Sequence, residues 1–574
     1  MRISFRCTWR VAGVLALTAV VLVLPAVASA ADFVLTASHW GKKQDAAVAA
    51  AGGTVVWSHG KAGIASVSSD DPDFLARVSS NKAFKTAAED MMVQWQDPDI
   101  GGQEITPGDE TFYPLQWNMP AMEAPDAWAT GCTGAGVRVA INDGGIDPAH
   151  PDLAPNMDTS CSASFVPGFD YDEDTGTFWH GMHVAGIVAA ADNGTGVIGV
   201  APEATLISVK VLHSGSGAFS WIIGGILYAA DPAAFERPEC DRADIINMSL
   251  GAGFNKRFVG GPGGSLVAAV ARAVNYATSK GTLVVSAAGN NGIDLGQAQD
   301  ITFVPAESGS GLAISATGPL DLAGVFGSPG DPRDPASYSN YGEGTTYVAA
   351  PGGEPGITAQ VVVNSPGSIA GPKVAQIAAY GPLPAGDTAD VALWTDPVDT
   401  TGDPHDACEG GTDPGVAGKF ALIHRGTCAF VTKSANSEAS GSVGTIISNN
   451  IPGLPPILGG SGAFGFPSVS ITQADGADIE GQLPGVNATM NYNSLGVLDQ
   501  VASSCKIGWC FAYGTSMASP AAAGVAALIK GANPGIPLGA LKTRLKNTAD
   551  DEGPNGHDEF YGHGFVNAYR ACTE

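Results

Sequence analysis

Over its central third, the chain alternates between short apolar runs and longer stretches with helical periodicity. Apolar runs at 136–143, 205–212, 243–250 and 282–290 predict buried strands, and the stretches at 181–191, 220–230 and 265–281 predict helices. Because strands and helices interleave strictly, the pattern predicts an α/β domain built on a parallel sheet with helices on both faces. In such a sheet, functional residues gather beyond the carboxyl ends of the strands.

The pattern differs on either side of this region. Residues 31–105 predict a small α/β unit, with strand-like runs at 32–40 and 53–69 and helical runs at 42–52 and 71–91. An acidic, glycine-containing linker follows from Asp97. Residues 354–493 are rich in Gly and Pro with short apolar runs, which predicts an inserted β-rich domain. The interrupted domain would then comprise residues 106–353 and 494–574.

The first 30 residues have the features of a secretion signal. Arg2, Arg6 and Arg10 precede a continuous apolar stretch, and Ala28-Ser29-Ala30 fits an A-x-A cleavage site. The alternative is an uncleaved membrane anchor. No other stretch is long and apolar enough to span a bilayer, so we expect an extracellular protein with no anchor once the signal is removed.

Charge and cysteine content narrow the classes further. The formal net charge is −28, which argues against nucleic acid as a partner because phosphate binding needs a basic surface. Removing the signal leaves eight of nine cysteines, an even number that fits four disulfides in an exported chain. Closeness in sequence favours two pairs, Cys408 with Cys428 and Cys505 with Cys510. The sequence does not determine how the other four cysteines pair; these are Cys132, Cys161, Cys240 and Cys572.

Four polar residues stand at the ends of these predicted strands and helices. Asp143 follows an apolar strand, His180 opens a helix, Asn290 ends a buried strand, and Ser516 begins an Ala-rich helix. Each alone fits an ordinary turn, a structural histidine or a helix cap, and His183 on the same helix competes with His180. Together they could supply a nucleophile, a base, its orienting carboxylate and an oxyanion donor. The order Asp, His, Ser is one that convergent triads use.

Several motifs resemble the subtilisin family of serine peptidases, the subtilases. The resemblance covers about 114–351, resumes near Leu495, and lies in "VAINDGGIDPAHPDL", "HGMHVAGIVAA", "INMSLG", "SAAGNNG" and "YGTSMASPAAAGVAAL". The stretch "GKFALIHRGTCAFVTKSANSEASGSVGTIISNN" resembles the protease-associated (PA) domain inserted in many large subtilases. Residues 31–105 resemble the family's propeptide, a folding assistant and intramolecular inhibitor.

The resemblance implies a role for each candidate. Asp143 would orient and support the imidazole of His180, which would take the proton of Ser516 and later pass it to the leaving amine. Ser516 would attack the scissile carbonyl of a protein or peptide substrate and form an acyl-enzyme. Asn290 would donate to the tetrahedral oxyanion. This chemistry needs no cofactor.

Two further sites are implied. Ser249, Leu250 and Gly251 resemble the edge strand that pairs with the substrate backbone, and a core strand end is the alternative. A second set resembles a structural calcium loop, since calcium favours mixed carboxylate, amide and backbone oxygens. Its members are Asp152, Asn193, Thr195 and Val197.

The chain departs from the family pattern near the candidate triad. Gly144 replaces the usual Ser or Thr after Asp143, Met182 replaces a usual Thr, and Asn142 replaces a commonly apolar residue. None of these removes a proton-transfer group. A non-catalytic binding protein is the main rival function, and it would usually have lost a triad residue. A lipase would need G-x-S-x-G, and Ala518 breaks that pattern around Ser516.

Overall fold

The computed structural model describes most of the chain after residue 30. The described residues are 31–96, 103–105, 112–175, 178–259, 263–298, 301–319, 331–354, 357–378, 380–382, 384–426, 428–450, 455–456, 458, 464–494, 501–506 and 508–574. The expected secretion signal at 1–30 lies outside them. Among the described residues, no helix combines the length and the apolar character needed to cross a bilayer.

The core of the molecule is a seven-stranded sheet in which every neighbouring pair is parallel. The strands, in spatial order, are β16 (Thr346–Pro351), β15 (Leu312–Thr317), β13 (Leu283–Ala287), β11 (Ile245–Met248), β7 (Arg138–Asp143), β9 (Thr205–Lys210) and β8 (Ala163–Ser164). The parallel sheet predicted from alternating strands and helices is therefore confirmed.

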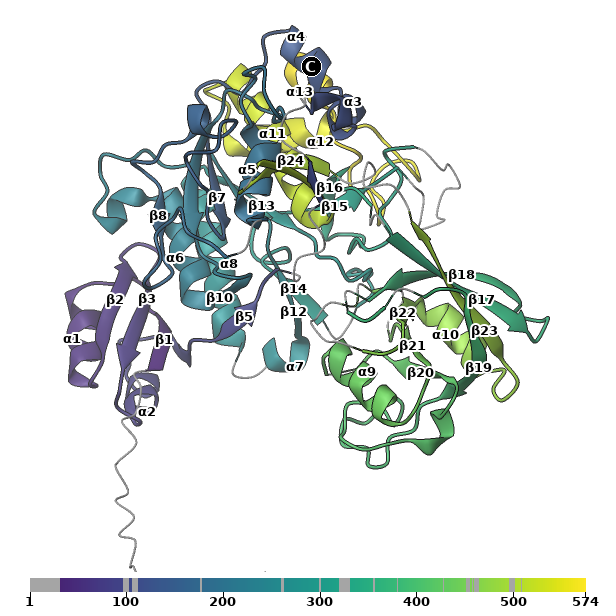
Figure 1. Cartoon of the computed structure of the whole chain (residues 1–574). Helices are drawn as coiled ribbons and strands as arrows, with labels where there is room; N and C mark the ends of the chain where they lie inside the picture. The colour runs from purple at the N-terminus through teal and green to yellow at the C-terminus, as the bar shows by residue number, and fades with distance from the viewer. Residues whose placement is uncertain are drawn as a thin grey trace, which may run out of the picture.

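Helices cover both faces of this sheet (Figure 1). On one face, α5 (His180–Ala189) and α11 (Thr515–Ala532) share a core with α12 (Leu538–Asn547) and α13 (Ala568–Thr573). On the other face, α6 (Phe219–Ala230) and α8 (Gly264–Ser279) form a second core. Nearly all of α5 is buried, which explains its uniformly small or apolar sequence.

The N-terminal unit is a separate four-stranded antiparallel sheet that packs on α6 and α8 (Figure 1). Its elements are β1 (Ala31–Thr36), α1 (Lys42–Ala50), β2 (Thr54–His59), β3 (Ile64–Ser69), α2 (Phe74–Ser79) and β4 (Thr86–Glu89). The single helix predicted over 71–91 is wrong, because α2 ends at Ser79 and β4 pairs with β1. Sheet pairing and the burial of Ala88 override the local helical pattern there.

After this unit the chain adds strands to two other parts of the molecule. β5 (Met92–Gln94) pairs antiparallel with β10 (Ser216–Ala218). β6 (Gln103–Ile105) pairs with β25 (Gly508–Ala512), which forms a hairpin with β24 (Val501–Cys505). The region predicted as a linker therefore includes a strand at 103–105 that is bound to the main domain.

The insert is a closed barrel to one side of the main sheet (Figure 1). Its strands are β17 (Ile357–Ser365), β18 (Gly371–Ile377), β22 (Ser468–Ile471), β21 (Gly444–Ser448), β20 (Phe420–His424), β19 (Asp387–Leu393) and β23 (Asn487–Ser494), with helices α9 (Phe430–Ala439) and α10 (Gln473–Glu480). The shorter connecting elements of the main domain are α3 (Asn118–Ala121), α4 (Ala124–Ala129), β12 (Ala252–Asn255), α7 (Lys256–Val259) and β14 (Ile301–Val304).

Four disulfides join the eight cysteines. Cys408–Cys428 and Cys505–Cys510 confirm the two pairs predicted from sequence. The remaining pairs are Cys161–Cys240 and Cys132–Cys572, the second of which spans 440 residues. Cys132 follows α4 and Cys572 lies in α13, so this bond connects the two halves of the main domain across the insert.

Candidate active site

Asp143 and His180 meet at the carboxyl edge of the sheet. Asp143 is the last residue of β7 and is 1% exposed, while His180 is the first residue of α5. The His180 Nδ1 atom lies 2.9 Å from Asp143 Oδ2, and the Gly144 N–H donates to Asp143 Oδ1 at 2.6 Å. A buried carboxylate on Nδ1 fixes the ring and leaves the other nitrogen for proton transfer.

Ser516 occupies the first turn of α11, next to the strand end that follows β11. Its Oγ donates to the Ser249 carbonyl at 3.2 Å, and Ser249 Oγ donates to the Ser516 carbonyl at 2.7 Å. Gly514, which precedes the helix, has φ +145°, a conformation that favours glycine. Ser516 is thus held at a helix N-terminus, where the N–H groups and the helix dipole favour negative charge.

Asn290, just beyond β13, reaches the same helix terminus. Its Oδ1 accepts hydrogen bonds from Thr515 N at 2.8 Å and from Thr515 Oγ1 at 2.7 Å. A methyl group built on Gly514 would lie 3.4 Å from Asn290 Nδ2 and 3.6 Å from Ser516 N. Asn290 Nδ2 and Ser516 N therefore both lie close to residue 514, an arrangement that suits a pair of donors to one oxyanion.

One peptide segment connects these two groups of residues. The Gly251 N–H donates to the Trp95 carbonyl at 2.8 Å, beside the strand end that holds Ser516. The next residue, Gln96, places its Nε2 atom 2.8 Å from both Asp143 Oδ1 and His180 Nδ1. The candidate triad and the predicted substrate strand thus face the same bound peptide.

Trp95 itself fills an aromatic pocket. Its side chain is 1% exposed, its ring centre lies 5.0 Å from that of Phe219 and 5.9 Å from that of Phe254, and its Nε1 donates to the Gly217 carbonyl at 2.8 Å. No pattern in the sequence indicates a role for this residue. A large aromatic in the polar stretch "VQWQDPD" was the available signal.

The competing histidine, His183, is structural. It is fully buried, its Nε2 lies 3.1 Å from the Val501 carbonyl, and burial, with a smaller contribution from His180, lowers its pKa to about 3. It therefore stays neutral wherever the protein is folded and cannot cycle protons at neutral pH.

This buried histidine predicts a pH dependence of stability. Unfolded His183 has the ordinary pKa of 6.5, so below that pH the unfolded chain binds a proton that the folded chain excludes. As the pH is lowered from 6.5 to about 3, this group should therefore lower the free energy of unfolding by about 1.4 kcal/mol for each pH unit. Denaturant unfolding of His183→Asn should lack this slope, and His557→Asn, at an exposed site, should keep it. Equal slopes in all three proteins would contradict the assignment.

Two charged residues that the sequence analysis missed lie behind Asp143. Lys210, fully buried and paired in register with Asp143, donates from Nζ to the carbonyls of Gly144 and Leu212. Burial lowers the pKa of Lys210 and raises the pKa of the nearby Asp174. A Cβ on Gly144 would lie 2.1 Å from Asp174 Oδ2, which explains why this chain has no Ser or Thr there.

The residues of the predicted calcium loop come together, and several of their side-chain oxygens accept hydrogen bonds within the protein. Asp152 Oδ2 accepts from Val197 N at 2.9 Å and from Trp509 Nε1 at 2.6 Å. Asn193 Oδ1 accepts from Thr195 N and Oγ1. Burial raises the pKa of Asp152, and its Oδ1 is buried without a hydrogen-bond partner among the described residues. The calcium site at this loop stays a prediction, in which Asp152 Oδ1 would be one of the six to eight oxygen ligands that the ion takes.

Three carboxylates also meet in the insert, at Asp396, Asp406 and Glu409, with one oxygen of each within 4.8 Å of the others. Lys433 is fully buried beside them and donates to the Asp406 carbonyl. Burial lowers the pKa of Lys433 to about 8, an effect that the carboxylates oppose. Lys433 supplies positive charge to this cluster, and we assign no metal to it.

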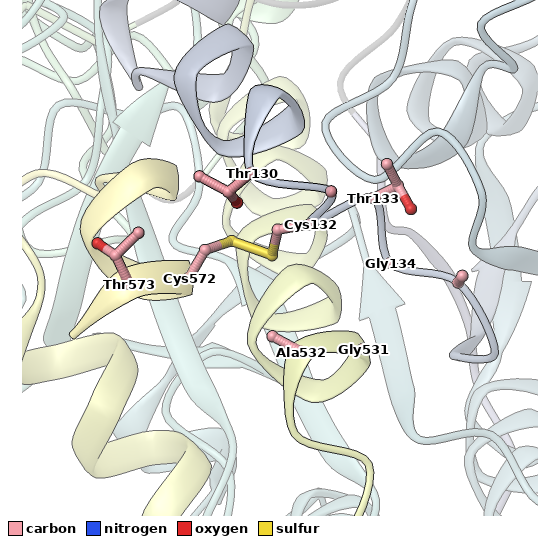
Figure 2. Close-up of a pocket in the computed structure, with 10 residues that line it drawn as sticks. Thr130, Cys132, Thr133, Gly134, Gly531, Ala532, Cys572 and Thr573 are labelled. Atoms are coloured by element: carbon pink, nitrogen blue, oxygen red, sulfur yellow. A yellow bond between two sulfur atoms is a disulfide. The ribbon is translucent and has the colours of Figure 1, made fainter.

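A pocket of about 320 Å³ surrounds the Cys132–Cys572 disulfide (Figure 2). It is lined by Thr130, Thr133, Gly134 and Gly531, among others, at the C-terminal end of α11. Ser516 lies at the opposite end of that helix, about 24 Å away at 1.5 Å per residue. This pocket is therefore separate from the candidate active site.

Comparisons with known proteins test the family resemblance found in the sequence. The subtilase family model matches residues 134–381 and 474–564, and the PA domain model matches 388–479. Subtilisin E of Bacillus subtilis (strain 168) is 36% identical over 260 residues, which are 45% of this chain and 60% of that protein. Subtilisin Savinase of Lederbergia lenta is 38% identical over 247 residues, which are 43% of this chain and 73% of that protein.

Among solved structures, the epidermin leader peptide processing serine protease from Staphylococcus aureus shares the fold. Its TM-score is 0.57 at 17% identity, and the match covers 95% of this chain and 98% of that one. The chain spans 60% of the length of Subtilisin E, whereas the family model matches more than half of the chain. These matches confirm the resemblance found in the sequence: the chain belongs to the subtilase family and carries an inserted PA domain.

Proposed function

We propose that the protein is a secreted serine endopeptidase, made as an inactive precursor. One observation carries the proposal: the segment Trp95–Gln96 contacts both the Asp143–His180 pair and Gly251, next to the strand end that holds Ser516. A substrate peptide in the same place would lie alongside the nucleophile and its base, with its backbone next to both.

The proposed reaction follows from these positions. His180 removes the proton of Ser516 as Oγ attacks the scissile carbonyl carbon, and Asn290 Nδ2 and the Ser516 N–H bind the oxyanion. The C–N bond then breaks, and His180 passes the proton to the leaving amine. Water, deprotonated by His180, next hydrolyses the acyl ester and restores Ser516. Asp143 orients the ring of His180 and supports the imidazolium.

The same segment supports protein and peptide chains as substrates. β5 adds to β10 as an antiparallel strand, and Trp95 is hydrogen-bonded through its N–H to the Gly215 carbonyl at 3.0 Å and through its carbonyl to Gly251. Main-chain bonds of this kind accept many sequences, and pockets select the side chains. This favours an extended peptide of several residues.

In the precursor, residues 31–96 would act as the enzyme's own inhibitor. Their sheet rests on α6 and α8, and the carboxylate of Asp90 accepts from Ser220 N in the first turn of α6. Maturation would then require a cut between Asp97 and Thr111, a region that lies outside the described residues except for 103–105. Export fits the secretion signal in the sequence.

Trp95→Ala should weaken this inhibition. Removing a fully buried Trp side chain costs about 3 kcal/mol or more, so the inhibition constant of segment 31–96, added in trans, should rise roughly 100-fold. Met91→Ala, at an exposed position of the same segment, is the matched control. Equal inhibition by both variants would show that the aromatic pocket contributes little.

Labelling with a fluorophosphonate probe tests the function directly. The processed protein should react, mass spectrometry should place the label on Ser516, and the same sample should cleave a denatured protein such as casein. Failure to label or to cleave would refute the proposal.

A further inference from the structure

The carboxylate of Asp174 lies between the loop that precedes β10 and the turn at Gly144, the residue that follows Asp143. Its side chain is 7% exposed, and Oδ1 accepts from Thr175 N at 2.9 Å and from Ser214 N at 3.2 Å. The other oxygen, Oδ2, faces Gly144, where a Cβ would lie 2.1 Å away. One side chain thus contacts the loop before β10 and the residue after Asp143.

On the side of the bound peptide, Asp174 accepts a hydrogen bond from the turn at Ser214 and Gly215, whose backbone conformation is unfavourable. Ser214 has φ +50° and Gly215 has φ +74°, and a left-handed conformation is unfavourable for a non-glycine residue such as Ser214. The Thr175 and Ser214 hydroxyls are also hydrogen-bonded at 2.8 Å. This turn directs the Gly215 carbonyl at the bound peptide, where it accepts from Trp95 N at 3.0 Å and from Gln96 N at 3.2 Å.

On the other side of Asp174, hydrogen bonds hold the turn at Gly144. The Gly144 N–H donates to Asp143 Oδ1, and Lys210 Nζ holds the Gly144 carbonyl. Lys210 also donates to the Leu212 carbonyl at 2.7 Å, two residues before the Ser214 turn. Asp174 and Lys210 therefore link the Asp143 turn to the loop that leads into β10.

We propose that Asp174 is a positioning residue for peptide substrates. By holding Ser214 in its left-handed conformation, it aims the Gly215 carbonyl at the substrate backbone, and the missing side chain at residue 144 makes room for it. Its contribution is to the binding of extended peptides and not to bond cleavage. The inference rests on the proposed peptidase function.

Substrates of two lengths distinguish a positioning role of Asp174 from a role in the stability of the whole fold. A peptide with four residues before the scissile bond reaches Gly215, and an ester of a single acylated amino acid does not. Asp174→Ala should raise KM for the long peptide about tenfold, the effect expected from losing hydrogen bonds that hold this turn. Its kcat, and both constants for the ester, should change less than about threefold.

Conservative and control variants sharpen the test. Asp174→Asn keeps an Oδ1 atom that can accept both N–H groups, so it should restore KM to within about threefold of the original. Asp172→Asn makes the same change two residues away and should leave KM unaltered.

The outcomes distinguish the inference from the function it rests on. If the unmodified enzyme cleaves neither substrate, the peptidase proposal fails. If it cleaves both, but Asp174→Ala changes the long peptide and the ester equally or changes neither, the positioning role is refuted. Should Asp174→Ala not fold, Asp174→Ser decides, because its shorter side chain also loses the hydrogen bond from Ser214 N: a KM increase confined to the long peptide supports the role, and any other result overturns it.

Discussion

Ser516→Ala is expected to lower kcat for peptide hydrolysis by roughly 10⁶-fold, the loss known for the nucleophile of subtilisin itself. The residue supplies the oxygen that bonds to the acyl group, and no described neighbour on its helix turn can replace that oxygen in the same geometry. KM should change little, because Gly215 and Gly251 make the contacts to the peptide backbone. Steady-state kinetics on a purified, correctly folded variant measure the effect.

The same variant should also remain full length after export, with residues 31–96 still in place, if maturation is the enzyme's own work. Ser519→Ala is the matched control, since Ser519 lies one turn further along α11 and bonds Asn247 instead. It should keep both processing and fluorophosphonate labelling. Residual activity of Ser516→Ala within about 100-fold of the original would contradict a covalent mechanism.

Asn290→Ala should lower kcat by roughly 10²–10³-fold, the range measured for the oxyanion donor of subtilisin itself. Asn290 has two sets of contacts in this structure, since Oδ1 accepts from Thr515 while Nδ2 faces the helix terminus. The variant alone does not separate them.

Asn290→Asp makes that separation, because it keeps the acceptor for Thr515 and loses the donor. If oxyanion donation is the main role, Asn290→Asp should be at least as impaired as Asn290→Ala, with KM nearly unchanged in both. Recovery of activity in Asn290→Asp would instead assign Asn290 to holding Thr515. Single-turnover kinetics of acylation measure the difference most directly.

The sequence predicted those parts of the molecule that local pattern controls. Alternating apolar strands and helices predicted the parallel sheet, because burial on both faces requires continuous apolar strands. Asp143, His180, Asn290 and Ser516 each adjoin such an element, so their shared edge could be predicted once the sheet was. The disulfides Cys408–Cys428 and Cys505–Cys510 could be predicted because their partners are close in sequence.

The rest depends on contacts between distant residues. Trp509 reaches Asp152 across 357 positions, and nothing near Asp152 indicates that an indole occupies its carboxylate. Asp174 lies in an irregular acidic loop, where a buried carboxylate has the same local sequence as an exposed one. The only sign of it was Gly144, whose missing side chain had a meaning only when the space beside it was known.

The Cys132–Cys572 disulfide determines what happens when a protease cuts the chain within the barrel. Asp143, His180 and Asn290 lie before the barrel and Ser516 lies after it, so a nick within residues 357–494 would divide these four candidate residues between two fragments. The bond joins those fragments covalently, from the loop after α4 to α13. A nicked molecule would therefore stay one covalent unit while this disulfide is intact, and after reduction its two fragments would be held by packing alone, as between α5 and α11.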